Sequence, residues 1–267
     1  MAENGRIFID DLEGAPAAPR ALSAGPGMPG SGVGEREEWL RRRNISAEQI
    51  AFEDEDPHSA RYTRLDVDET AGTILHYWFG YAAERTVSLQ DRMTLWFGGG
   101  FQLDRIIAYR FSEIVAKLAS GEAHRWAAIG VQERLAAVIA LDQFSRNIFR
   151  GTAAAFENDA IALDLCKDAI ASGDDMKLKP VERWFLYMPL EHSESATDQR
   201  RSVEKFSELL SQGGPELHPH LLLAYDFAKR HAAVITKFGR FPHRNAMLGR
   251  TSTSAEKAFI AKTPMGF

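Results

Sequence analysis

Residues 132–150, QERLAAVIALDQFSRNIFR, decide the fold of this chain. Apolar side chains recur in them at the three- and four-residue spacing of an α-helix, and Gly151 follows where a C-terminal cap glycine is expected. Two charges fall inside this apolar stripe, since Asp142 and Arg146 lie within about 20° of its centre on a helical wheel. A helix with a buried acid–base pair at i and i+4 is therefore predicted, because charges buried without a partner are costly.

The same helical period recurs on both sides of this stretch. It predicts further helices over residues 101–118, 156–172, 180–188, 196–210 and 219–238. Pro180 suits a first helical turn, and Pro189 is expected to break or kink the helix before it. Thr253 and Glu256 have the spacing of a capping box and predict a short last helix. No segment alternates as a strand would, so we expect an all-α fold, an antiparallel array of helices joined by short loops.

The first 69 residues differ in composition from the remainder. They hold 8 Lys and Arg against 15 Asp and Glu, a net charge of −7, whereas residues 70–267 hold 24 against 22. Residues 14–34 are rich in Gly, Pro, Ala and Ser and carry almost no large apolar side chains, so they cannot bury a core. We predict a disordered acidic leader or linker over 1–69 and a single all-helical domain over 70–267.

Several classes of protein are not expected from this composition. The chain has one cysteine, Cys166, so it cannot form an internal disulfide, which fits a reducing compartment. No run approaches the roughly 18 apolar residues of a membrane helix, and the N-terminus lacks the order of a signal peptide. We therefore expect a cytoplasmic protein with no membrane partner.

Polar residues also stand on apolar faces elsewhere. His231 lies inside the stripe of the helix predicted over 219–238, and the segment PLEHSE (189–194) places Glu191, His192 and Glu194 close together. Two carboxylates with a histidine are suited to acid–base chemistry. Their spacing matches no metal-binding motif, and H-E-x-x-H in particular is missing, so we expect no metal and no cofactor.

The segment FGRFPHRNAMLGRTST (238–253) is basic, and no acidic residue occurs between Asp226 and Glu256. Arginine presents a planar fork that fits a carboxylate or a phosphate. This pattern supports an anion-binding loop, or else arginines that cap helix ends and pair with acids from other segments. The residues of interest here are Arg240, His243, Arg244, Asn245 and Arg250.

Four blocks of the sequence resemble one known family. These are LDQFSRNIFRG (141–151), FENDAIAL (156–163), FLYMPLEHSE (185–194) and FGRFPHRNAMLGRTST (238–253). Together they are similar to the domain of unknown function 924 family, which is mainly bacterial and is grouped with tetratricopeptide-like helical proteins. The resemblance implies an α-α superhelix and names no chemistry. Ser145 stands where the family usually has a proline.

The motif of that family and the misplaced polar residues select nearly the same positions. The candidate binding residues are Asp142, Gln143, Arg146, Asn147, Arg150, Glu191, His192, Glu194, His231, Arg240, His243, Arg244, Asn245 and Arg250. They favour binding of an anionic small molecule, with or without catalysis. A tetratricopeptide-like module that clamps a peptide carboxylate is the alternative. RNA binding ranks third, because residues 70–267 carry a net charge of only +2.

Overall fold

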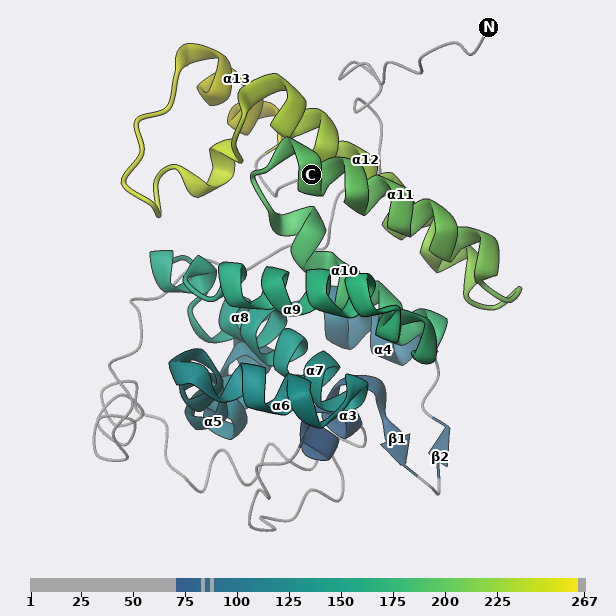
Figure 1. Cartoon of the computed structure of the whole chain (residues 1–267). Coiled ribbons are helices and arrows are strands. Elements are labelled where there is room, and N and C mark those ends of the chain that lie inside the picture. Colours follow the sequence, from purple (N-terminus) through teal and green to yellow (C-terminus); the bar gives the residue numbers. More distant parts are fainter. Residues whose placement is uncertain (1–70, 83–84, 87–88, 264–267) are drawn as a thin grey trace, which may run out of the picture.

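The structure is a computed structural model, and it describes residues 71–82, 85–86 and 89–263. Helices account for most of these residues (Figure 1). The first half holds α3 (Ala71–Phe79), α4 (Leu89–Phe97), α5 (Phe101–Lys117), the π-helical turn η3 (Leu118–Glu122), α6 (Ala123–Ile129), α7 (Val131–Val138), the π-helical turn η4 (Ile139–Phe144) and α8 (Ser145–Ile148). The leader predicted over residues 1–69 lies outside the described residues.

The second half continues with helices and short 3-10 turns. Its elements are η5 (Ala153–Phe156), α9 (Asp159–Ser172), η6 (Asp174–Lys177), α10 (Pro180–His192), α11 (Ala196–Gln212), α12 (His218–Phe238), η7 (Pro242–Arg244) and α13 (Ser254–Lys262). Two strands of two residues each, β1 (Tyr81–Ala82) and β2 (Arg85–Thr86), form a small antiparallel ladder. The all-α prediction is confirmed, whereas the tetratricopeptide-like superhelix stays a prediction.

Most predicted helices are present near their expected bounds. The helix predicted over 132–150 is present as one helical segment from Val131 to Ile148, with a π-helical turn in its middle. The capping box is formed, because the Thr253 side chain accepts from the Glu256 backbone and the Glu256 carboxylate accepts from the Thr253 backbone. Helices α3, α4 and α6 were not predicted, and each has nine residues or fewer.

A helix was expected to end or to kink at Pro189, and the prediction that it ends there is wrong. Helix α10 continues through Pro189 to His192. Proline removes one backbone donor from the helix. The last carbonyls of α10 nevertheless accept hydrogen bonds from a side chain of the neighbouring helix. Gln199 of α11 donates through Nε2 to the carbonyl of Glu191 at 2.6 Å and to that of Ser193 at 2.7 Å. This side chain caps α10 from the neighbouring helix, so the turn after the proline keeps its acceptors satisfied.

Aromatic side chains from distant segments form the centre of the core. The Trp78 ring lies 5.4 Å from that of Phe185, and the Phe111 ring lies 4.5 Å from that of Phe144. Trp96 donates through Nε1 to the carbonyl of Trp78 at 2.9 Å. The same core encloses Cys166. The apolar N-terminal segments therefore pack against the helices that carry the polar candidates.

Helix α10 lies centrally and packs against α7, α9, α11 and α12. In Figure 1, α11, α12 and α13 lie on one side of it, and α3 to α9 lie on the other. A small second core beneath α13 contains Val234, Ile235, Phe241 and Phe259. The C-terminal end of α10 therefore lies where the two sides meet. Among the described residues, no helix has both the length and the apolar character needed to cross a membrane.

Candidate functional site

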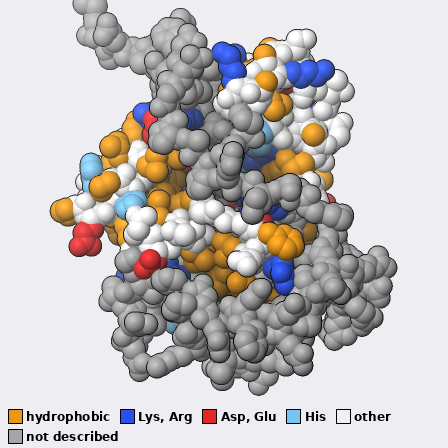
Figure 2. All heavy atoms as spheres, turned by 180° about the vertical axis from the view of Figure 1, so that it is seen from behind, with side chains coloured by type: hydrophobic (Ala, Val, Ile, Leu, Met, Phe, Trp, Pro, Cys, Tyr) orange, Lys and Arg blue, Asp and Glu red, His pale blue; other side chains and the backbone are white. Residues whose placement is uncertain are grey.

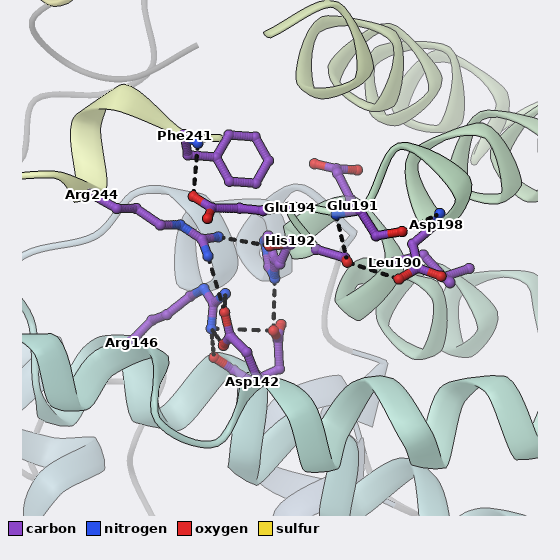
Figure 3. Close-up of polar contacts among 12 residues, drawn as sticks. Asp142, Arg146, Leu190, Glu191, His192, Glu194, Asp198, Phe241 and Arg244 are labelled. Carbon is purple, nitrogen blue, oxygen red and sulfur yellow. Dashed lines mark hydrogen bonds and ion pairs between the residues drawn. The ribbon is translucent and has the colours of Figure 1, made fainter. Parts of the chain in front are cut away.

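The carboxylate of Asp142 is the centre of the polar contacts shown in Figure 3. It lies on η4 and is only 1% exposed. His192 Nδ1 lies 2.7 Å and Arg146 Nη1 lies 3.2 Å from Asp142 Oδ1, while Gln143 Nε2 donates to Oδ2 at 2.5 Å. Burial by itself would raise the pKa of Asp142, but Arg146 and His192 together bring it well below its ordinary value. Asp142 is thus a buried and permanently charged carboxylate.

The π-helical turn η4 gives Asp142 this position. π-turns inside α-helices are rare and occur frequently at functional sites. Here the turn lies between α7 and α8, in the segment that packs against both α9 and α10. The i to i+4 pairing predicted for Asp142 and Arg146 is present, and Arg146 Nη1 also donates to the Asp142 carbonyl at 2.9 Å. The charges inside the apolar stripe therefore face two other helices.

Asp159, the first residue of α9, joins two arginines. Arg146 donates to it through both terminal nitrogens, at 2.8 Å to Oδ1 and 3.1 Å to Oδ2. Arg244, which comes from η7, donates through Nη1 to the same Oδ2 at 3.2 Å. Both guanidinium groups also lie over the Phe156 ring, at 5.8 Å for Arg146 and 4.6 Å for Arg244. Two cations therefore share one carboxylate oxygen and one aromatic ring.

Arg244 is the more buried of the two arginines. Its Nη2 donates to the His192 carbonyl at 3.0 Å, and its Nε is buried without a hydrogen-bond partner in the part of the chain that the structure describes. Burial and the nearby Arg146 lower the pKa of Arg244 to about 10. For Arg146, burial is outweighed by Asp142 and Asp159, which raise its pKa. Arg244 is therefore the less compensated cation.

His192 occupies a defined tautomer. An ionised carboxylate can only accept, so Nδ1–H of His192 donates to Asp142 and leaves Nε2 as the acceptor of the neutral ring. Within the described residues, Nε2 makes no hydrogen bond. The side chain is 12% exposed. Burial and the charge of Arg146 lower the pKa of His192 below its ordinary value, which keeps the ring neutral near pH 7.

Glu191 and His231 form a second pair next to the first. Glu191 Oε1 lies 3.2 Å from His231 Nδ1, and that nitrogen also lies 2.9 Å from the Phe227 carbonyl. Burial and the charge of Asp142 raise the pKa of Glu191 to about 8, so this carboxyl is protonated at neutral pH. The pKa of His231 is well below its ordinary value, mainly because the ring is buried. The His192 and His231 rings lie 6.3 Å apart.

We call this set of side chains the Asp142 cluster. Its members are Asp142, Arg146, Asp159, Glu191, His192, His231 and Arg244. Asp142 and Arg146 come from the segment over 132–150, and Glu191 and His192 come from the segment PLEHSE (189–194). No group of three or more His, Cys, Asp or Glu side chains in the described part of the chain is arranged to hold a metal ion.

The remaining candidate arginines are paired outside the cluster. Arg150 donates to Asp104 at 2.6 and 2.8 Å, and Asn147 donates to the same carboxylate at 2.8 Å. Arg250 and Arg240 make similar two-bond pairs, Arg250 with Glu194 at 2.7 and 2.9 Å and Arg240 with Glu256 at 2.7 and 2.9 Å. For these three arginines, the alternative in which they pair with acids from other segments therefore describes the structure.

Two of the C-terminal candidates are tied to their own loop. Asn245 is buried and donates to Ser252 Oγ at 3.0 Å. The His243 ring lies 5.7 Å from the Phe241 ring, and burial together with Arg244 lowers its pKa to about 4. Both contacts therefore lie within the segment that carries Arg244.

Residues 74–264 match a family model described as a bacterial protein of unknown function (DUF924). The chain belongs to the DUF924 family. A solved structure of a protein of unknown function, ATU0120, from Agrobacterium tumefaciens is also similar to it. That similarity has 30% sequence identity and a TM-score of 0.60, and it covers 72% of this chain and 97% of that chain. A search among curated proteins finds no match.

All four sequence blocks that resemble the DUF924 family meet at the Asp142 cluster. Block 141–151 supplies Asp142 and Arg146, and block 156–163 supplies Phe156 and Asp159. Blocks 185–194 and 238–253 supply the remaining contacts. Sequence reasoning missed Phe156 and Asp159. An acid in a first helical turn is common, so Asp159 gave no sign that it joins two arginines.

Proposed function

We propose that this chain binds an anionic small molecule, a carboxylate or a phosphate, at Arg146 and Arg244. One observation carries the proposal, namely that both guanidinium groups share the single oxygen Oδ2 of Asp159, at 3.1 and 3.2 Å. The two guanidinium groups repel each other where they meet, so this one carboxylate oxygen does not fully satisfy both of them. A carboxylate or phosphate with several acceptor oxygens would give each fork an oxygen of its own.

The neutral ring of His231 supports the same proposal. Over the whole cluster, Asp142 and Asp159 balance the charges of the two arginines, so a bound anion adds one negative charge. His231 is neutral near pH 7 and can take up a proton that offsets this charge, while His192 stays neutral. Anion binding is therefore expected to be accompanied by proton uptake, which favours binding at lower pH.

Access favours Arg146 as the first contact. Its side chain is 20% exposed, as against 8% for Arg244. Arg146 is therefore the more accessible of the two guanidinium groups. Arg150, Arg240 and Arg250 differ from this pair, because each makes two hydrogen bonds to a carboxylate that it does not share with a second arginine among the described residues.

A thermal-shift screen of the full chain tests the proposal. The ligands are phosphate, nucleotides, sugar phosphates, di- and tricarboxylates, short RNA, and peptides with a free or an amidated C-terminus. A ligand at about 100 times its Kd adds about 2.7 kcal/mol, or roughly 5–10 °C for a chain of this size.

Two conservative variants show where binding occurs. Arg146→Lys keeps the charge and loses the fork, so the shift is expected to disappear. Arg230→Lys is the matched control, because Arg230 pairs with Asp226 of the same helix α12 and, among the described residues, makes no hydrogen bond or ion pair with a member of the cluster. An equal shift in both variants, or no shift for any small anion, overturns the proposal.

Two other outcomes would redirect the assignment. A shift from peptides with a free C-terminus, absent for their amides, would favour the peptide-clamping alternative. A shift from RNA that falls steeply with salt would favour nucleic-acid binding. RNA ranks last, because Lys and Arg side chains lie in separate spots on the face seen in Figure 2, where hydrophobic side chains cover much of the described surface.

A further inference from the structure

We propose that Asp142 and His192 form a catalytic dyad in which Nε2 of His192 takes a proton from water that attacks a phosphate ester held by Arg146 and Arg244. The inference rests on the proposed anion site and adds a reaction to it. It depends on the way in which the imidazole, its carboxylate and the two arginines are joined in the Asp142 cluster (Figure 3).

The orientation of the histidine is the first argument. The bond of 2.7 Å between Nδ1 and Oδ1 of Asp142 fixes both the ring and its tautomer. Asp142 is itself held by Gln143 and Arg146, so it cannot turn away from the ring. Asp142 acts here as a positioning residue. A neutral histidine held this way presents a basic nitrogen, which suits general-base catalysis near pH 7.

The absence of a protein nucleophile next to His192 is the second argument. Among the described residues, the ring nitrogens of His192 have no hydrogen bond to a serine, threonine or tyrosine hydroxyl or to a cysteine thiol. Cys166, the single cysteine of the chain, is enclosed in the apolar core. Water is therefore the group from which Nε2 would take a proton.

The arginines lie where the charge of the reaction develops. Arg146 contacts Asp142 and Arg244 contacts the His192 carbonyl, so an anion held by both is adjacent to the dyad. A phosphate ester supplies both the anion that the arginines bind and the electrophilic phosphorus that water attacks, so the reaction needs no second bound group. Catalysis of phosphoryl transfer consists mainly of positioning and of stabilising charge on the phosphoryl oxygens, and paired guanidinium groups do both.

The step balances without another reactant. The water oxygen forms a bond to phosphorus, and one of its protons passes to His192 Nε2. The bond from phosphorus to the leaving oxygen breaks, and the leaving group departs with that electron pair. For a nitrophenyl ester the leaving phenolate needs no proton. The imidazolium, stabilised by Asp142, then returns its proton to solvent.

The test uses 4-nitrophenyl phosphate and bis(4-nitrophenyl) phosphate as probes with the full chain. His192→Asn is the decisive variant, because its amide nitrogen can still donate to Asp142 in place of Nδ1 and it lacks a basic nitrogen. We expect turnover in the wild type to fall by about 10²-fold or more in His192→Asn, while the thermal shift with inorganic phosphate is unchanged. Arg230→Lys is expected to keep wild-type turnover.

Asp142→Asn gives a separate test of the positioning role. It is expected to lower kcat by a larger factor than it changes KM for the probe, since the phosphate contacts belong to the arginines and Arg146 keeps its two hydrogen bonds to Asp159. Failure of this inference differs from failure of anion binding. A phosphate shift without turnover of either probe, or with equal turnover in His192→Asn, overturns the dyad and leaves the anion site standing. If inorganic phosphate gives no thermal shift with the wild type, both the anion site and the dyad are overturned.

Discussion

Replacing Glu191 by glutamine should remove a loss of stability at alkaline pH. Glu191 is 6% exposed, and burial with the nearby Asp142 raises its pKa from 4.5 to about 8. Between these values the native chain holds a proton that the unfolded chain has released. The free energy of unfolding therefore falls as pH rises, by about 1.4 kcal/mol per pH unit, and levels off above pH 8. The expected loss is about 2 kcal/mol between pH 6.5 and pH 9.

Urea denaturation of the wild type and of Glu191→Gln at a series of pH values measures this loss. The histidines of the cluster have lowered pKa values, so their contribution lies at acid pH, where the unfolded chain takes up protons first. Glutamine resembles the protonated carboxyl and does not titrate. The free energy of unfolding of Glu191→Gln should therefore lack the loss of about 2 kcal/mol that the wild type shows between pH 6.5 and pH 9. Parallel curves for the two chains between pH 6.5 and pH 9 would refute the argument that Glu191 is buried and protonated.

Three further substitutions test other parts of the fold. Phe144→Ala, which empties a fully buried aromatic position, should lower the free energy of unfolding in urea by about 3–5 kcal/mol, and a loss below about 1 kcal/mol would contradict the packing. Thr253→Ala removes an N-cap and should cost about 1 kcal/mol, with faster amide exchange at Glu256 as its local sign. A double-mutant cycle with Arg250→Met and Glu194→Gln should give a coupling of about 1 kcal/mol or less that shrinks in 1 M salt, because the pair is partly exposed. A salt-independent coupling would contradict that exposure.

The helices could be predicted because their apolar spacing is long and regular. The segment around Leu135 shows this, since its stripe gave both the helix and the buried position of Asp142. Helix α10 shows the limit of such reasoning. Pro189 predicted a break or a kink, whereas α10 continues to His192 and Gln199 of another helix donates to the carbonyls at its end. A sequence read one segment at a time does not contain that contact.

The candidate site was predicted as a list of residues, and its pairing pattern was not. Helical phase singled out Asp142, Arg146 and His231 because they interrupt apolar stripes. It could not indicate that Arg250 pairs with Glu194 while Arg244 shares Asp159 with a second arginine. Those choices depend on distances between elements far apart in the chain. Asp159 looked like an ordinary helix-start residue for the same reason.

The position of Cys166 makes this protein convenient to follow by thiol chemistry. It is the single cysteine of the chain, its sulfur lies inside the main core, and burial raises its pKa. A disulfide reagent such as Ellman's can therefore react only when the helices around it separate. The reaction rate of the natural chain, with no engineered label, then reports how often the core opens. Any ligand that binds the closed form should slow that reaction in proportion to its occupancy.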